Sequence, residues 1–157
     1  MILYHGSNCE FDTIDLLRSK PNKDFGRGFY LSDNREQAME MARIKVDQLE
    51  CGALSVMAYK VDEAAMETLR VLRFGEYSEE WARFILLNRN NATNHQAHDY
   101  DIVIGPIAND RVGVQLWRYE TRAIDLSTLV RNLQYMKGIT IQYFFGTEKA
   151  VKLLKRI

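Results

Sequence analysis

Short apolar runs bounded by glycine, proline, asparagine or serine recur along the chain, and each predicts a β-strand. The first run ends where His5-Gly6-Ser7-Asn8 favours a turn. The run at residues 101–106 is nearly all apolar and closes on a Gly-Pro turn signal, which is typical of a buried strand. The predicted strands cover residues 1–4, 29–31, 54–61, 69–74, 100–107 and 139–145.

Between these runs, apolar residues recur every three or four positions behind a residue that can cap a helix. The first such segment follows residues 32–34, one of which caps it, and runs to about Glu50. The last begins at Thr147 and ends with the basic pair Lys155-Arg156, which suits the helix dipole. The other predicted helices cover residues 62–67, 78–87, 109–123 and 127–136.

Short strands mixed irregularly with helices predict an α+β fold rather than a regular parallel winding. A length of 157 residues with 46% apolar residues suits one soluble domain over residues 1–157. Lysine plus arginine and aspartate plus glutamate both number 21, and this balance argues against a dedicated nucleic-acid binder. Cys9 and Cys51 lie far apart, and no apolar run reaches the roughly 18 residues of a transmembrane helix. We therefore expect a cytoplasmic protein without disulfides or membrane contact.

The first candidate for chemistry is His5, at the end of the first predicted strand. A histidine at such a turn can present its ring to a cleft, and Gly6 lets a ligand approach the backbone. A purely structural hydrogen bond from His5 is the alternative.

The second candidate is the glycine-rich segment over residues 25–32. Gly26 and Gly28 resemble the start of a dinucleotide-binding fingerprint, but Leu31 occupies the third glycine position and a strand follows instead of a helix. The Rossmann interpretation therefore fails. A flexible bend remains, which places Tyr30 on a strand where its ring either stacks on a flat heterocycle or packs in the core.

Two further segments contain polar groups in suggestive places. Gln142 opens a strongly apolar strand, where its amide must find a partner or face a cavity. Glu148 lies in the first turn of the last predicted helix, where a favourable dipole interaction explains it. His95 and His98 have an H-x-x-H spacing, but their asparagine-rich surroundings predict a loop, so we expect no metal site.

Taken together, these segments resemble the ADP-ribosyltransferase superfamily, in the clade whose signature is a histidine, a tyrosine and a third polar residue on three strands. More narrowly, the chain is similar to an uncharacterised bacterial domain family within that superfamily. The resemblance implies split, twisted β-sheets with flanking helices and an NAD cleft between two small sheets. It rests on the segments LYHGS (3–7), PNKDFGRGFYL (21–31), DYDIVIGPIANDRV (99–112) and QYFFGTEKA (142–150).

The resemblance implies transfer of ADP-ribose from NAD to a macromolecular acceptor, protein or nucleic acid, with release of nicotinamide. With water as the acceptor, the protein would be an NAD glycohydrolase. NAD is then a substrate, no metal is required, and a toxin-like role with an antitoxin or other partner protein is left open. His5 would bond the adenosine-side ribose, the backbone of Gly6 would hold the carboxamide, and Tyr30 would stack on the nicotinamide. The remaining NAD-binding candidates are Ser7, Arg27 as a pyrophosphate contact, Gly28 and Ser32.

At the third signature position this chain has Gln142, where the superfamily commonly has glutamate. An amide can accept the same hydrogen bond from the ribose 2′-hydroxyl but supplies no negative charge. At an effective dielectric constant near 20, a unit charge about 4 Å from the developing cation is worth on the order of 4 kcal/mol. An auxiliary carboxylate, from Glu148, Asp101 or Asp110, is one way to compensate. The alternatives are a catalytically weak NAD or ADP-ribose binding module, and a nucleic-acid-modifying relative that uses the basic residues of segment 20–27.

Overall fold

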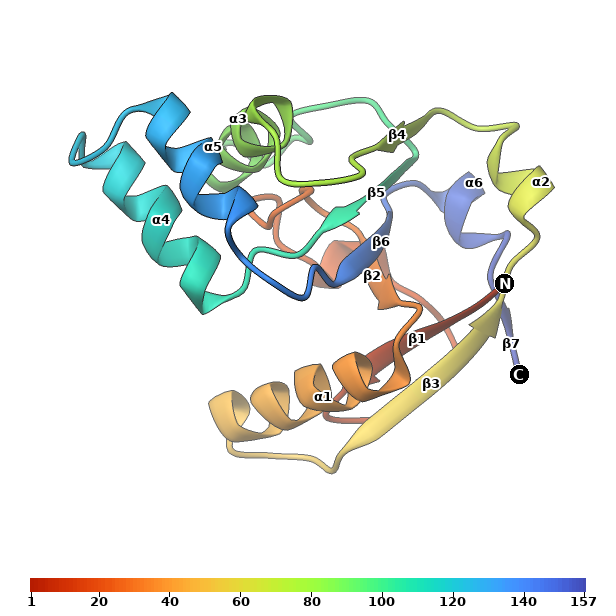
Figure 1. Cartoon of the computed structure of the whole chain (residues 1–157). Coiled ribbons are helices and arrows are strands. Elements are labelled where there is room, and N and C mark those ends of the chain that lie inside the picture. The colour runs from red at the N-terminus through yellow and green to blue at the C-terminus, as the bar shows by residue number, and fades with distance from the viewer.

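One seven-stranded mixed sheet runs through the molecule in the computed structural model, which describes residues 1–157 (Figure 1). The strand order is β4-β5-β6-β2-β1-β3-β7, with β4 parallel to β5 and every other pair of neighbours antiparallel. The strands are β1 (Ile2–Ser7), β2 (Phe29–Ser32), β3 (Ser55–Lys60), β4 (Val71–Arg73), β5 (Ile102–Pro106), β6 (Ile141–Phe145) and β7 (Lys155–Arg156).

Six α-helices flank this sheet, so the predicted α+β class is confirmed. Side-chain caps start the longer helices as the sequence predicts. Asn34 accepts hydrogen bonds from two backbone N–H groups, and Ser78 accepts one from Trp81. The helices are α1 (Arg35–Leu49), α2 (Glu63–Met66), α3 (Glu79–Arg89), α4 (Asp110–Glu120), α5 (Leu126–Gln134) and α6 (Glu148–Val151), with a short 3₁₀ turn over Leu16–Arg18.

The sheet nearly divides between β1 and β2. These strands pair only at Tyr4 and Ser32, whereas β1 pairs with β3 at six positions and β2 with β6 at four. The two expected small sheets are therefore halves of one hydrogen-bonded sheet. Figure 1 shows β1, β3 and α1 diverging from the half that contains β2, β5 and β6, and α3, α4 and α5 cover that second half.

Two apolar cores stabilise the two faces of the sheet. One core joins alternate residues of β1, β2, β3 and β6 to the short helices α2 and α6, and the other joins β5 and β6 to α3, α4 and α5. Each core side chain is removed from water, which favours folding by about 1.5–3 kcal/mol for a large aliphatic or aromatic residue. The largest fully buried side chains include Trp81, Phe25, Phe144, Phe145 and Leu3.

Two expectations about chain segments were wrong. β1 extends to Ser7, so His5 lies within a strand and not in a turn, because β1 pairs with β3 as far as Ser7 and Ser55. The last helix ends at Val151, and Lys155–Arg156 form β7 against β3. Backbone pairing at the edge of the sheet overrides the helical pattern there, and the Arg156 guanidinium donates to the carbonyl of Phe11 at 2.8 Å.

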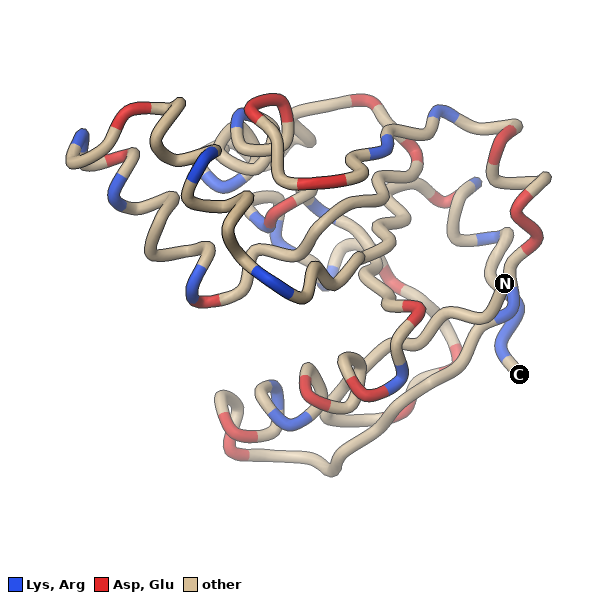
Figure 2. Tube along the Cα trace, viewed as in Figure 1, with Lys and Arg blue, Asp and Glu red and all other residues tan.

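Basic and acidic residues are interspersed along the whole trace (Figure 2). Cys9 and Cys51 are both free and exposed. No helix combines the length and the apolar character that crossing a membrane requires.

Candidate functional site

Three sequence-predicted side chains come from three adjacent strands at the point where the sheet divides. Tyr4 of β1 pairs with Ser32 of β2, and Ser32 pairs with Gln142 of β6. At a strand spacing of about 4.8 Å, the outer two backbones lie roughly 10 Å apart. His5 follows Tyr4, and Tyr30 lies two residues before Ser32, on the same face of the sheet as Ser32 and Gln142. The sheet therefore brings the backbones of His5, Tyr30 and Gln142 close together, while strand alternation turns the His5 side chain toward the opposite face from those of Tyr30 and Gln142.

The imidazole of His5 joins β1 to the backbone and a side chain of β2. Its Nδ1 lies 2.6 Å from the carbonyl oxygen of Tyr30, and its ring stacks on Phe29 at 4.2 Å between centroids. Its Nε2 lies 3.2 Å from the Lys45 ammonium. Burial, reinforced by the Lys45 charge, lowers the pKa of His5 to about 3. A neutral ring satisfies both contacts in one tautomer, with Nδ1–H donating to Tyr30 and Nε2 accepting from Lys45.

The buried neutral imidazole makes stability depend on pH. An unfolded histidine has a pKa near 6.5, whereas the pKa of His5 in the folded protein is about 3. Between these two pH values the unfolded chain binds a proton at His5 and the folded protein does not. Stability from this residue is complete above pH 6.5 and is lost as pH falls. We expect the free energy of unfolding to drop by roughly 3–5 kcal/mol more in the native protein than in His5→Asn between pH 7 and 3.5. Urea titrations at several pH values across that range measure the free energy of unfolding of both proteins. The same pH dependence in native protein and His5→Asn would contradict the prediction.

The Tyr30 hydroxyl is held by the backbone of the glycine-rich bend. It donates to the carbonyl of Gly26 at 2.7 Å and accepts from the N–H of Phe25 at 3.0 Å. Burial raises the pKa of Tyr30 well above its ordinary value, so the phenol stays neutral. Lys23 Nζ lies 5.3 Å from the ring centroid, in a cation–π contact. The edge contact with Phe144 packs Tyr30 against the core, as one of the two sequence interpretations expected, and stacking on a flat heterocycle stays a prediction.

Gln142 contains an unsatisfied buried donor. It lies between Ser32 and Gly105 on the neighbouring strands, and its Nε2 is buried without a hydrogen-bond partner. Such a donor costs about 1–3 kcal/mol, which a ligand oxygen would recover. The amide therefore fits a ligand that offers an acceptor at this point of the sheet.

The carboxylates named as substitutes for a catalytic glutamate lie elsewhere. Gln142 is near the start of β6, and the three residues to Phe145 span roughly 10 Å, so the exposed Glu148 at the start of α6 lies beyond the opposite end of the strand. Asp101 is fully buried at that same end, where it accepts from the Thr147 hydroxyl and pairs with Lys149. Neither carboxylate is brought to Gln142. Asp110 begins α4 and is exposed.

The predicted NAD-binding glycines are positions of close approach. A Cβ on Gly6 would lie 1.8 Å from the carbonyl oxygen of Ala38, so β1 packs directly on α1. A Cβ on Gly28 would lie 2.1 Å from the ring of Phe144. Both glycines are thus explained by packing, and Gly6 still presents its carbonyl to the site.

The remaining NAD-binding candidates have structural partners. Ser7 and Ser32 are buried, and the Ser32 hydroxyl accepts from the N–H of Asn34. The Arg27 guanidinium donates to the carbonyl of Ser19 at 3.0 Å and to the Asn94 side chain at 2.7 Å. Arg27 therefore ties its own loop to the loop around residue 94, and its role as a pyrophosphate contact stays a prediction.

Sequence reasoning missed Lys45. Its ammonium donates to the carbonyl of Gly6 at 2.7 Å in addition to contacting His5. Burial, followed by the charge of Lys23, lowers the pKa of Lys45 to about 8. The available signal was its position on the apolar stripe of α1, where a lysine must find partners or reach solvent.

His98 has a structural role. Its Nε2 lies 2.8 Å from the carbonyl oxygen of Phe25, and its Nδ1 accepts from the N–H of Tyr100 at 3.1 Å. Both ring nitrogens are occupied, whereas His95 is exposed. No cluster of three or more histidine, cysteine or acidic side chains is arranged to hold a metal ion.

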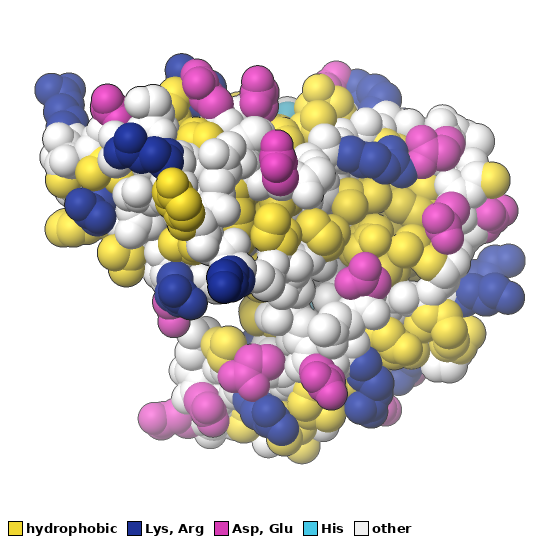
Figure 3. Space-filling model, in the orientation of Figure 1, with side chains coloured by type: hydrophobic (Ala, Val, Ile, Leu, Met, Phe, Trp, Pro, Cys, Tyr) yellow, Lys and Arg dark blue, Asp and Glu magenta, His cyan; other side chains and the backbone are white.

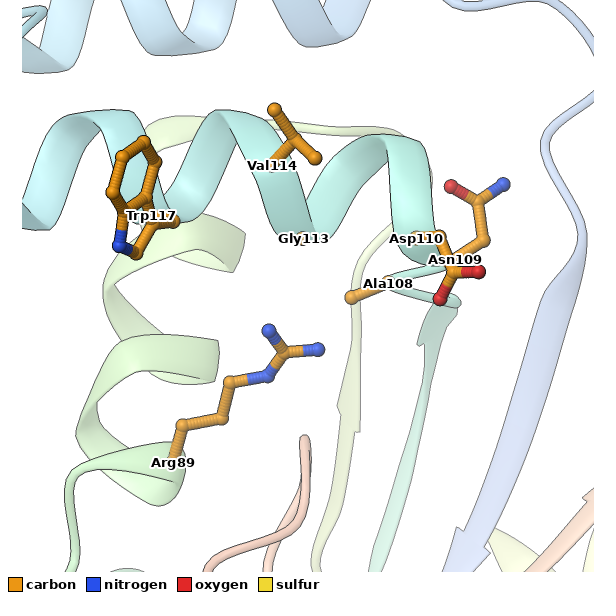
Figure 4. A pocket seen from close by; sticks show the side chains of 7 residues that line it. All are labelled: Arg89, Ala108, Asn109, Asp110, Gly113, Val114 and Trp117. Carbon is orange, nitrogen blue, oxygen red and sulfur yellow. The ribbon is translucent and has the colours of Figure 1, made fainter. Parts of the chain in front are cut away.

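A separate open cavity of about 350 Å³ lies between α3 and α4. Figure 4 shows the Arg89 side chain pointing toward α4, which has Asp110 at its start and Trp117 about two turns later. The Arg89 guanidinium is already paired with Asp24 at 2.7 Å. This cavity contains none of His5, Tyr30 and Gln142, while the space-filling view shows an indentation between the α1 half and the α4–α5 half (Figure 3).

Residues 1–156 match a family model described as "Protein of unknown function (DUF3990)". The chain belongs to the DUF3990 family. Comparison of the chain with curated proteins gave no match. Because the DUF3990 match spans nearly the whole chain, the strands that contain His5, Tyr30 and Gln142 all lie within the family domain.

Proposed function

We propose that this DUF3990 protein is an ADP-ribosyltransferase that transfers ADP-ribose from NAD to a macromolecular acceptor and releases nicotinamide. The observation that carries the proposal is the placement of His5, Tyr30 and Gln142 on the adjacent strands β1, β2 and β6, with the His5 ring bonded to the backbone carbonyl of Tyr30 where the sheet divides. The resemblance of the sequence to the superfamily signature supports the same assignment, since the three matching positions lie on neighbouring strands.

The hydrogen-bonding groups around His5 and Gln142 match donors and acceptors of NAD. His5 Nε2 and the Gly6 carbonyl only accept, and the Lys45 ammonium now donates to both. A ribose hydroxyl and a carboxamide N–H can replace the ammonium at these two acceptors. The Gln142 Nε2 offers an N–H to the oxygen of the nicotinamide-side ribose, and Tyr30 supplies an aromatic ring for the nicotinamide.

The reaction breaks the bond between the ribose anomeric carbon and the nicotinamide nitrogen. The bonding electrons leave with the nicotinamide, whose ring becomes neutral, and positive charge develops on the ribose. A nucleophilic atom of the acceptor then bonds that carbon and loses its proton to solvent. The site contributes by holding the ribose and excluding water, and it stabilises the developing charge through dipoles, because Gln142 is neutral. We therefore expect slow turnover.

Nicotinamide release tests the proposal. We expect the native protein with NAD and cell extract to release nicotinamide, measured by chromatography, and to leave a mass shift on its acceptor. His5→Ala removes an acceptor and should weaken NAD binding about tenfold, whereas Gln142→Ala should mainly lower turnover. His95→Ala changes an exposed loop histidine and is the matched control, with unchanged activity.

Release no greater than that of Tyr30→Ala, with or without extract, would contradict transferase activity. Calorimetric NAD binding in that case would support the second candidate, a binding module, which the neutral amide of Gln142 favours. Labelled product that resists protease but is lost with nuclease would identify a nucleic-acid acceptor.

A further inference from the structure

Two ammonium groups lie beside β2 without a carboxylate partner. Lys45 Nζ contacts His5 and the Gly6 carbonyl, and Lys23 Nζ lies over the Tyr30 ring. Neither lysine is in an ion pair, although ten pairs form elsewhere in the chain. Asp24, the carboxylate next to Lys23 in the sequence, is bonded to Arg89 at 2.7 Å. The two lysines are thus free to bind another anion.

The two charges act on each other and on the groups around them. After burial, the Lys23 charge is the next cause that lowers the pKa of Lys45, and Lys23 also contributes to the low pKa of His5. Burial lowers the pKa of Lys23 as well, and Lys20 adds to this effect while Asp24 opposes it. Two ammonium charges close together repel each other, and this repulsion raises the free energy of the folded protein. A bound anion offsets the repulsion.

We propose that Lys23 and Lys45 bind the diphosphate bridge of the dinucleotide. An ammonium group has three N–H donors, and Lys45 uses two of them in the protein, while Lys23 donates no hydrogen bond to it. A diphosphate has two negative charges and several acceptor oxygens, which match this pair. The inference rests on the proposed function. In that proposal His5 binds one nucleoside of NAD and Tyr30 contacts the other, and the diphosphate links these two nucleosides. Lys45 lies beside His5 and Lys23 lies beside Tyr30, so the two ammonium groups are near the two ends of that link.

Calorimetry with inorganic pyrophosphate, ADP-ribose and NAD tests this site. We expect Lys23→Gln and Lys45→Gln each to weaken pyrophosphate and NAD binding about tenfold and to reduce the dependence of affinity on salt. Lys60→Gln is the matched control, because Lys60 is an exposed lysine near the end of β3 remote from Gly6, and its affinities should match the native ones. Thermal melts confirm that each variant is folded.

The outcomes separate this inference from the transferase proposal. Loss of pyrophosphate binding in both variants supports the anion site even if NAD is never cleaved. Absence of pyrophosphate binding by the native protein, or equal affinities in native and variant proteins, overturns the anion site. Unchanged NAD cleavage by Lys23→Gln and Lys45→Gln would likewise overturn it while leaving the transferase in place.

Discussion

Gln142→Glu is expected to release nicotinamide from NAD about 100-fold faster than the native protein. A carboxylate about 4 Å from the developing ribose cation is worth on the order of 4 kcal/mol at an effective dielectric constant near 20, which is roughly a thousandfold in rate. Desolvation of the carboxylate offsets part of this gain, because the Nε2 that it replaces is buried. Initial rates at saturating NAD measure the change, with Gln134→Glu, an exposed substitution on α5, as the control.

The same substitution should destabilise the protein at neutral pH. A buried carboxylate without a donor at this position should lower the free energy of unfolding by about 1–3 kcal/mol. This loss of unfolding free energy should become smaller as pH falls toward about 4. There the glutamic acid is protonated in the unfolded chain as well as in the folded protein, so neither state has a charged carboxylate to bury. A faster but less stable variant would show that the native amide restrains the chemistry. A slower variant that still binds NAD would mean that the site works only with an amide.

Gly6→Ala is expected to cost at least about 3 kcal/mol of stability. The added Cβ would lie 1.8 Å from the carbonyl oxygen of Ala38 and 2.8 Å from the backbone nitrogen of Ala42, so α1 must move away from β1. Neither contact can be relieved by a side-chain rotation, because both atoms belong to the helix backbone. In a domain of this size, the midpoint of thermal unfolding should fall by roughly 6–12 °C.

Gly75→Ala is the matched control, since a Cβ at Gly75 meets nothing within 4 Å. It should change stability by less than about 0.5 kcal/mol. Gly6→Ala should also weaken NAD binding, because moving α1 away from β1 changes the position of Lys45 relative to the Gly6 carbonyl and His5, the groups proposed to bind the dinucleotide. A Gly6→Ala protein with native stability would contradict the close packing of β1 on α1.

Local patterns were sufficient for most of the fold. The alternating and apolar runs predict β3, β5 and β6 to within a few residues. Short polar side chains before helical stripes predict a cap within residues 32–34, where the structure has Asn34, and a helix start at Ser78. These signals succeed because strand and helix periodicities are properties of consecutive residues. Lys155–Arg156 became a strand instead, because its conformation depends on β3, a partner almost one hundred residues away.

The candidate site shows the same division. His5, Tyr30 and Gln142 were nominated from local motifs together with the family resemblance, although the turn expected at His5 is a strand in the fold. The fold established the role of Lys45, since its partners His5 and Gly6 are about forty residues distant, and it separated Glu148 from Gln142 by the length of β6. Which groups face one another, and which lysines are left without a counter-charge, follows from long-range strand pairing and helix packing.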